Sequence, residues 1–198
     1  MKKIAIVALL SACVATPAWA VDNTGKFYGA IDLGYTALNN SSAINGSTWG
    51  PTPGTVRLAG GYNFSENWAV EVGYAQSAKS TYNSTVLGIG NGAEVGQNSS
   101  LQVAAVGILP VSEAFSLFAK LGLANNRTDY TMTSNYGASV AGVGSSTSLL
   151  TGIGVQYNIN RKFALRVQSE SFGHNQIGPG SGVRISTSMT SIGGVYTF

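Results

Sequence analysis

Ile192-Gly193-Gly194-Val195-Tyr196-Thr197-Phe198 is the last stretch of the chain, and its alternate positions form two unlike faces of an extended strand. One face carries Ile192, Gly194, Tyr196 and the terminal Phe198, whereas the other carries Gly193, Val195 and Thr197. Alternation with a period of two predicts a β-strand that has one apolar face. The same pattern recurs through the rest of the chain, so this ending is typical of the whole fold.

Seven earlier segments alternate in the same way, although segment 101–109 is apolar on both sides and its parity is the least certain. Each is close to the length of a strand that crosses a bilayer at a tilt. The pattern therefore predicts an all-β fold of about eight antiparallel strands. The segments are 26–38, 55–64, 68–75, 101–109, 115–123, 149–157, 163–170 and 191–198.

The N-terminus predicts export. Lys2 and Lys3 precede a short apolar run, and Ala18 and Ala20 supply the small residues of a cleavage site, so residues 1–20 match a secretory signal peptide. An alternative is lipoprotein processing, in which Cys13 becomes a lipidated N-terminus.

With cleavage after Ala20, residues 21–198 form one domain without cysteine. The net charge falls from +3 for the whole chain to about +1 for this domain, which argues against a nucleic-acid partner.

Short and long connections alternate between the predicted strands. Segments 65–67, 110–114 and 159–162 are tight, whereas 39–53, 77–99, 126–147 and 173–182 are longer and rich in Ser, Asn, Thr and Gly, which indicates irregular loops. All tight turns then lie at one end. Outer-membrane barrels have short periplasmic turns and longer external loops, so the pattern favours an up-and-down transmembrane barrel.

The scarcity of charge decides which face of the strands is outside. A soluble barrel of the lipocalin type also alternates, but its water-facing exterior needs many charged residues. Charged residues make up 10% of this chain, against about 25% in an ordinary soluble domain. The apolar face carries no charge in the middle of any strand, so it is predicted to face lipid.

Six charged residues remain on the opposite face, which is predicted to line the lumen. They are three acids and three bases, and an unpaired charge there is costly, so we expect a mutual ion-pair network. Such a network either fills and seals the lumen or gates a narrow ion path. The six are Asp32, Arg57, Glu71, Lys120, Arg166 and Glu170.

Aromatic residues crowd the short-turn ends of the predicted strands, which indicates an interfacial girdle. Its predicted members are Phe27, Phe64, Trp68, Phe115, Tyr157, Phe163, Tyr196 and Phe198.

The chain resembles the small OmpA-like and OmpX-like outer-membrane barrels, including the opacity proteins, with the barrel domain alone. The resemblance rests on Gly152–Asn160 with Phe163–Val167, on Asn67–Tyr74 and on Leu117–Gly122. It implies a salt-bridge network that includes Glu71, Lys120 and Arg166. Gln168 departs from the family pattern, because relatives place a second acid there, and Glu170 is a possible substitute. The resemblance also implies that Tyr196 and Phe198 form the signal read by the barrel-assembly machinery.

The sequence therefore predicts a monomeric outer-membrane barrel with a structural and surface-interaction role. Outer-membrane lipid, lipopolysaccharide and host or cell-surface ligands at the loops are the predicted partners, with neither a cofactor nor a metal. A small channel or porin is the alternative. A lipid A-modifying enzyme is a third hypothesis, but His174, the single histidine, lacks a neighbouring hydroxyl nucleophile in the usual His-x-Ser arrangement and is expected in an external loop.

Overall fold

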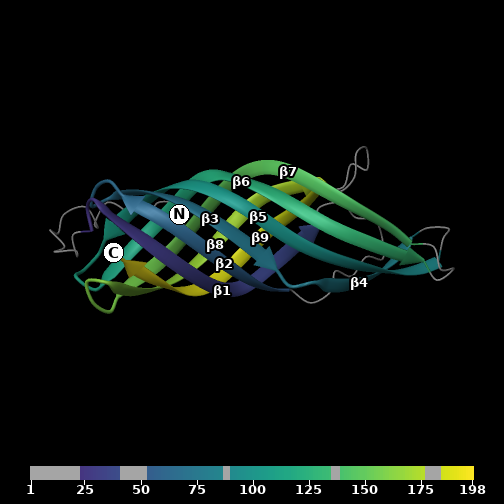
Figure 1. The fold of residues 1–198 in the computed structure, drawn as a ribbon, viewed down its shortest axis with the longest axis horizontal. Coiled ribbons are helices and arrows are strands. Elements are labelled where there is room, and N and C mark those ends of the chain that lie inside the picture. The colour runs from purple at the N-terminus through teal and green to yellow at the C-terminus, as the bar shows by residue number, and fades with distance from the viewer. Residues whose placement is uncertain (1–22, 41–52, 87–89, 135–138, 177–183) are drawn as a thin grey trace, which may run out of the picture.

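A computed structural model describes residues 23–40, 53–86, 90–134, 139–176 and 184–198. These residues form nine strand segments arranged as a closed antiparallel barrel (Figure 1). No helix in the described part is long and apolar enough to cross a membrane. The segments are β1 (Lys26–Asn40), β2 (Gly54–Asn63), β3 (Trp68–Ser77), β4 (Ser80–Val86), β5 (Gly90–Pro110), β6 (Phe115–Ser134), β7 (Ser139–Asn158), β8 (Phe163–Gln176) and β9 (Arg184–Thr197).

The nine segments make eight barrel strands, because β3 and β4 both pair with β5 and together form one interrupted strand. Each strand pairs with its neighbour in sequence, and the barrel closes where β1 meets β9, from Tyr28 opposite Thr197 to Asn40 opposite Ile185. The predicted eight-stranded up-and-down barrel is therefore confirmed.

The three predicted tight turns are present, and each joins its strands by backbone hydrogen bonds. The N–H of Phe64 donates to Trp68 O over 3.2 Å, Val111 to Phe115 O over 2.9 Å, and Ile159 to Phe163 O over 2.9 Å. Since consecutive strands are antiparallel, all three turns lie at one end of the barrel, together with the C-terminus (Figure 1).

The prediction of irregular loops over 77–99 and 126–147 was wrong for most of these residues. β4 and the first half of β5 occupy much of the first range, and β6 and β7 continue as a paired ladder as far as Thr133 opposite Ser139. Polar residues hold these pairs together, as when the Thr128 hydroxyl donates to Asn98 over 2.7 Å. Thr, Val and Tyr have high strand propensity, so a polar composition did not prevent pairing.

Two smaller predictions about connections also change. His174, expected in a loop, lies in β8 opposite Ser186, and the β8–β9 register shifts between Ser171 and His174. Positions 39–40 likewise belong to β1. The remaining parts of the predicted loops, 41–52 and 177–182, lie outside the described residues, as do Cys13, Ala18 and Ala20 of the predicted signal.

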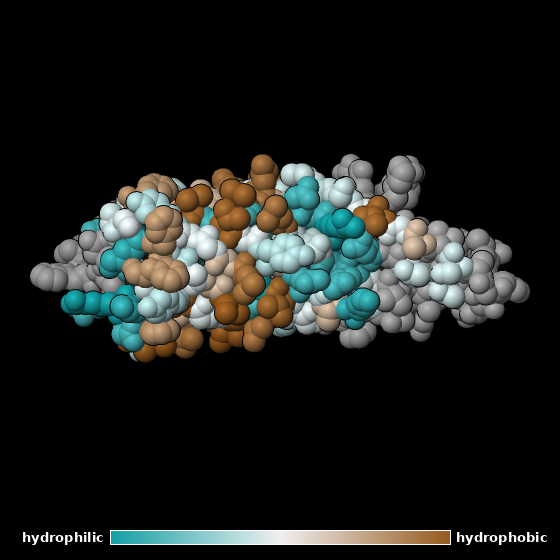
Figure 2. Space-filling view, in the orientation of Figure 1, coloured by the Kyte–Doolittle hydropathy of each residue, from teal (hydrophilic) through white to brown (hydrophobic). Residues whose placement is uncertain are grey.

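The apolar face points outward, which inverts the arrangement of a soluble barrel. Leu58, Leu121 and Ile153 are exposed by 54%, 59% and 69% of their surface, and the visible face carries a band of apolar side chains with polar ones beyond it (Figure 2). Aromatic rings line the short-turn end, where Phe115 and Tyr157 pack with their centroids 4.9 Å apart. Burial is therefore confined to the lumen, and the outer face matches a lipid environment.

We expect Leu121→Arg to lower the free energy of unfolding in phospholipid vesicles by about 2–4 kcal/mol, the cost of an arginine near the bilayer midplane. Thr131→Arg is the matched control, because Thr131 is exposed on the same face of β6, beyond the apolar band. Equal stability of the two variants would contradict a lipid-facing wall at Leu121.

Candidate functional site: the charged lumen

The six charged lumen residues lie together in one buried cluster, which we call the lumen plug: Asp32, Arg57, Glu71, Lys120, Arg166 and Glu170. Alternation along five of the eight barrel strands turns these side chains inward, and each is at most 3% exposed. Three carboxylates face three cations, so the buried group is neutral as a whole. Neutrality and dense pairing are the conditions under which charges tolerate removal from water.

Glu71 is the hub of the lumen plug. Its Oε1 accepts from Arg57 Nη2 over 2.5 Å and from Lys120 Nζ over 2.7 Å. Its Oε2 accepts from Arg166 Nη1 and from the Tyr28 hydroxyl, each over 2.9 Å. One carboxylate therefore contacts all three cations of the cluster and ties β1, β2, β6 and β8 to β3.

The other two carboxylates flank this hub. Asp32 accepts from Arg166 Nε over 2.7 Å and from Arg57 Nη1 over 2.9 Å. Glu170 lies 3.0 Å from Lys120 Nζ and 3.5 Å from Arg57 Nε. Each cation therefore lies between two or three carboxylates, and removing any one acid leaves at least two cations with fewer partners.

Neutral side chains complete the cluster. Gln102 accepts from Arg57 Nε over 2.8 Å and Gln168 accepts from Lys120 Nζ over 2.7 Å. Gln168, where the family resemblance led us to expect an acid, thus still contacts the lysine as an acceptor, while Glu170 supplies the charge one inward position farther along β8. Tyr28 and Gln102 were not predicted as members, although the inward parity of Tyr28 was readable from the sequence.

Glycines make room for the long charged side chains. A Cβ atom at Gly73 would lie 2.8 Å from Arg57 Nη2, and one at Gly152 would lie 3.1 Å from the Glu170 side chain. Both glycines face the lumen, on β3 and β7. Glycines on the inward face thus leave space that the plug fills, as expected in a narrow eight-stranded lumen.

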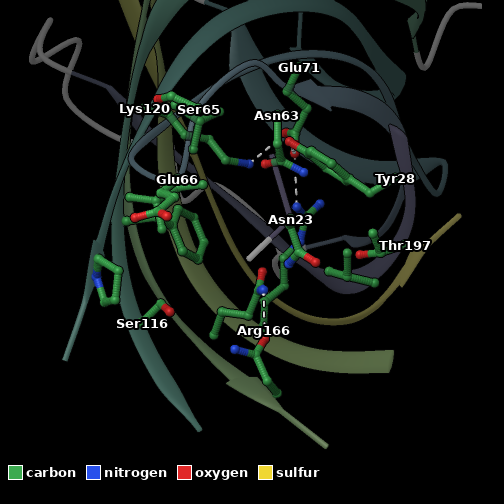
Figure 3. A pocket seen from close by; sticks show the side chains of 17 residues that line it. Asn23, Tyr28, Asn63, Ser65, Glu66, Glu71, Ser116, Lys120, Arg166 and Thr197 are labelled. Atoms are coloured by element: carbon green, nitrogen blue, oxygen red, sulfur yellow. Dashed lines mark hydrogen bonds and ion pairs between the residues drawn. The ribbon is translucent and has the colours of Figure 1, made fainter. Parts of the chain in front are cut away.

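The lumen contains two separate cavities on either side of this cluster. The larger, about 60 Å³, lies toward the short turns, is bordered by Tyr28, Glu71, Lys120 and Arg166, and is shown in Figure 3. The smaller, about 20 Å³, lies toward the other end and is lined by polar groups such as Thr36, Thr55 and Ser100. The two share no lining residue, and the smaller has room for about one water molecule.

The predicted assembly residues lie on the outer surface at the seam that closes the barrel. Phe198 is 73% exposed, and its ring meets Tyr196 edge-on with centroids 5.1 Å apart. Tyr196 also packs against Phe163 at 4.9 Å, and the Phe198 N–H donates to Phe27 O over 3.0 Å. The last residue is therefore part of the aromatic girdle and also continues the β1–β9 hydrogen bonding.

Solved structures that are similar to this chain include several small barrels. Ail, the attachment invasion locus protein of Yersinia pestis, solved alone and with the heparin analogue sucrose octasulfate, is 21% identical with a TM-score of 0.59, over 88% of this chain and 99% of its own. Neisserial surface protein A is 17% identical with a TM-score of 0.61, over 87% and 97%. OprG from Pseudomonas aeruginosa is 14% identical with a TM-score of 0.54, over 88% and 96%.

At these identities the likeness concerns the fold alone. The search of curated proteins finds no match. The model of the outer membrane protein beta-barrel domain, in contrast, matches residues 6–198. Together with the closed barrel and its apolar exterior, this match shows that the chain belongs to the outer membrane protein beta-barrel domain family and resides in the bacterial outer membrane.

Proposed function

We propose that the protein is a monomeric surface-interaction barrel with an adhesion-like role, whose lumen is closed by the plug. The observation that carries this proposal is the length of three strands. β5, β6 and β7 have 21, 20 and 20 residues, whereas about 10 residues suffice to cross the membrane. Together with β4 they continue well past β1 and β9 as a sheet (Figure 1). We call this sheet, which consists of β4 with residues 90–99 of β5, 125–134 of β6 and 139–147 of β7, the external extension.

The surface chemistry of the external extension supports an uncharged partner. Asn125, Thr131, Ser145 and Thr147 are exposed on its outer face. Arg127 lies 3.2 Å from Asp129, and both side chains are about half exposed, so its charge is largely offset. Ail binds a polysulfated sugar analogue. Arg127 is the only cation among the described residues of the external extension, so we propose a neutral protein or glycan surface as its partner.

Shortening the β6–β7 hairpin tests this role. We expect deletion of residues 128–144, with Asn-Gly joining Arg127 to Ser145, to abolish binding of expressing cells to cultured epithelial cells. Arg127 and Ser145 are paired in the register, so a two-residue turn preserves the strands below them. Lys162→Gln in a short turn is the control. Normal binding by a truncated, folded barrel would contradict the proposal.

The closing role of the plug is also part of the proposal, because six paired charges separate the two cavities. We expect Glu71→Gln to lower the free energy of unfolding by about 3–5 kcal/mol, since three buried cations lose a charged partner. Urea titration in phospholipid vesicles measures this loss. Glu113→Gln, in an exposed turn, should change stability by about 0.5 kcal/mol or less.

A small-conductance channel is the second candidate, and the observation in its favour is the cavity that reaches Glu71, Lys120 and Arg166 from the short-turn end. Planar-bilayer recording separates the two functions. A sealed wild-type barrel gives no steady conductance, whereas a reproducible open level in the wild type would favour the channel. We propose no catalytic role, and none is assigned to His174 in β8.

The terminal aromatic is proposed as an assembly signal that engages the barrel-assembly machinery. We expect Phe198→Ala to reduce the amount of folded barrel in the outer membrane several-fold while leaving the unfolding midpoint of the folded fraction nearly unchanged. Phe163→Ala is the matched control, because both rings contact Tyr196. Equal yields of the two variants, measured by heat-modifiable migration on gels, would assign Phe198 to the girdle only.

A further inference from the structure

The lipid-facing wall contains a groove of about 710 Å³ that crosses six strand segments, β3 and β5 to β9. Its floor follows one row of paired residues, in which Trp68 faces Gly107, Gly107 faces Ala119, and Ala119 faces Ile153. The row continues from Ile153 to Ser169 on β8 and from there to Thr190 on β9. At about 4.8 Å per neighbouring strand, it is roughly 24 Å long.

Side-chain size explains the hollow. Gly107 and Ala119 are small, whereas the larger side chains of Leu117, Val155 and Val167 line the sides of the groove. The Trp68 ring closes one end, since its nearest atom would lie 3.4 Å from a Cβ at Gly107. Trp68 begins β3 beside a short turn, and Thr190 lies midway along β9, so the groove runs obliquely from the periplasmic boundary toward the outer half of the membrane.

The upper end of the groove is polar, although it lies on the lipid-facing surface. On β8 the outward apolar run stops at Val167 and Ser169 follows, and on β9 Thr190 is the first outward residue beyond Ile192. On β6, in contrast, exposed leucines continue to Leu123. Within the described part of the chain, neither Ser169 nor Thr190 has a side-chain hydrogen bond. A hydroxyl that faces hydrocarbon without a partner is unfavourable.

We propose that this groove binds one acyl chain of the lipid A part of lipopolysaccharide, with an acyl-linkage oxygen hydrogen-bonded to Ser169 and Thr190. Lipid is the occupant because the groove is continuous with the apolar band that contacts the bilayer. Lipid A, the outer-leaflet lipid, is favoured because the polar end points toward the side of the long strands, which is external in barrels of this type. The hydroxyls then gain the partners that the bare wall lacks.

Native mass spectrometry of the purified, folded barrel tests the proposal, with lipid A and a phosphatidylethanolamine added separately. We expect one tightly bound lipid A. Ala119→Phe fills the groove and should weaken binding at least about tenfold. Gly60→Phe adds the same ring at an exposed position of β2, outside the groove, and should bind as the wild type does.

Ser169→Ala combined with Thr190→Val removes both hydroxyls at nearly constant shape and should also weaken binding at least about tenfold. This second variant keeps the test decisive if the larger phenylalanine disturbs folding, which heat-modifiable migration reports. Equal binding by the wild type and the double variant would overturn the proposal. Equal retention of phosphatidylethanolamine would overturn the assignment to lipid A.

Discussion

The structure depends on the neutral packing of six charges inside a narrow lumen, centred on Glu71. A carboxylate buried without a partner is costly, but here it accepts from three cations and a phenol at 2.5–2.9 Å. These contacts join five strands, β1, β2, β3, β6 and β8. Glycines such as Gly73 and Gly152 lie beside the charged groups, where a Cβ atom would come too close to Arg57 or Glu170. A barrel with this exterior needs such a filling, because its apolar residues face lipid and contribute little to an internal core.

The apolar groups that do lie inside are arranged in two layers around the plug. One cluster, which includes Tyr28, Phe118 and Val195, lies toward the short turns. The other, which includes Leu150, Phe172 and Met189, lies toward the external end. The plug is therefore insulated from water on both sides except at the two small cavities. This insulation strengthens its ion pairs and makes the loss of one partner expensive.

Strand number, direction, turn positions and the facing of the charged residues were predictable, because period-two alternation and the scarcity of charge are local signals. Asp32 and Arg166 could be assigned to one lumen by parity alone. Two features were not predictable. The polar ranges 77–99 and 126–147 carry loop-like composition, and only cross-strand pairing such as Thr128 with Asn98 shows that most of them are strand. The second feature is that Tyr28 and Gln102 belong to the plug. The alternating pattern shows neither how far the Tyr28 side chain reaches nor which face of β5 carries Gln102.

The seam between β1 and β9 has a consequence for the order of events in folding. Asp32 and Arg166 are separated by 134 positions, and the barrel is closed only when β9 pairs with β1. Until that strand pairs with β1, the lumen stays open to water and every charge of the plug remains hydrated. The desolvation cost therefore falls in the final step, together with the contacts that offset it. A shift of one residue in the β1 register turns Asp32 toward lipid. A barrel with the correct register is therefore separated in free energy from a slipped one when it closes.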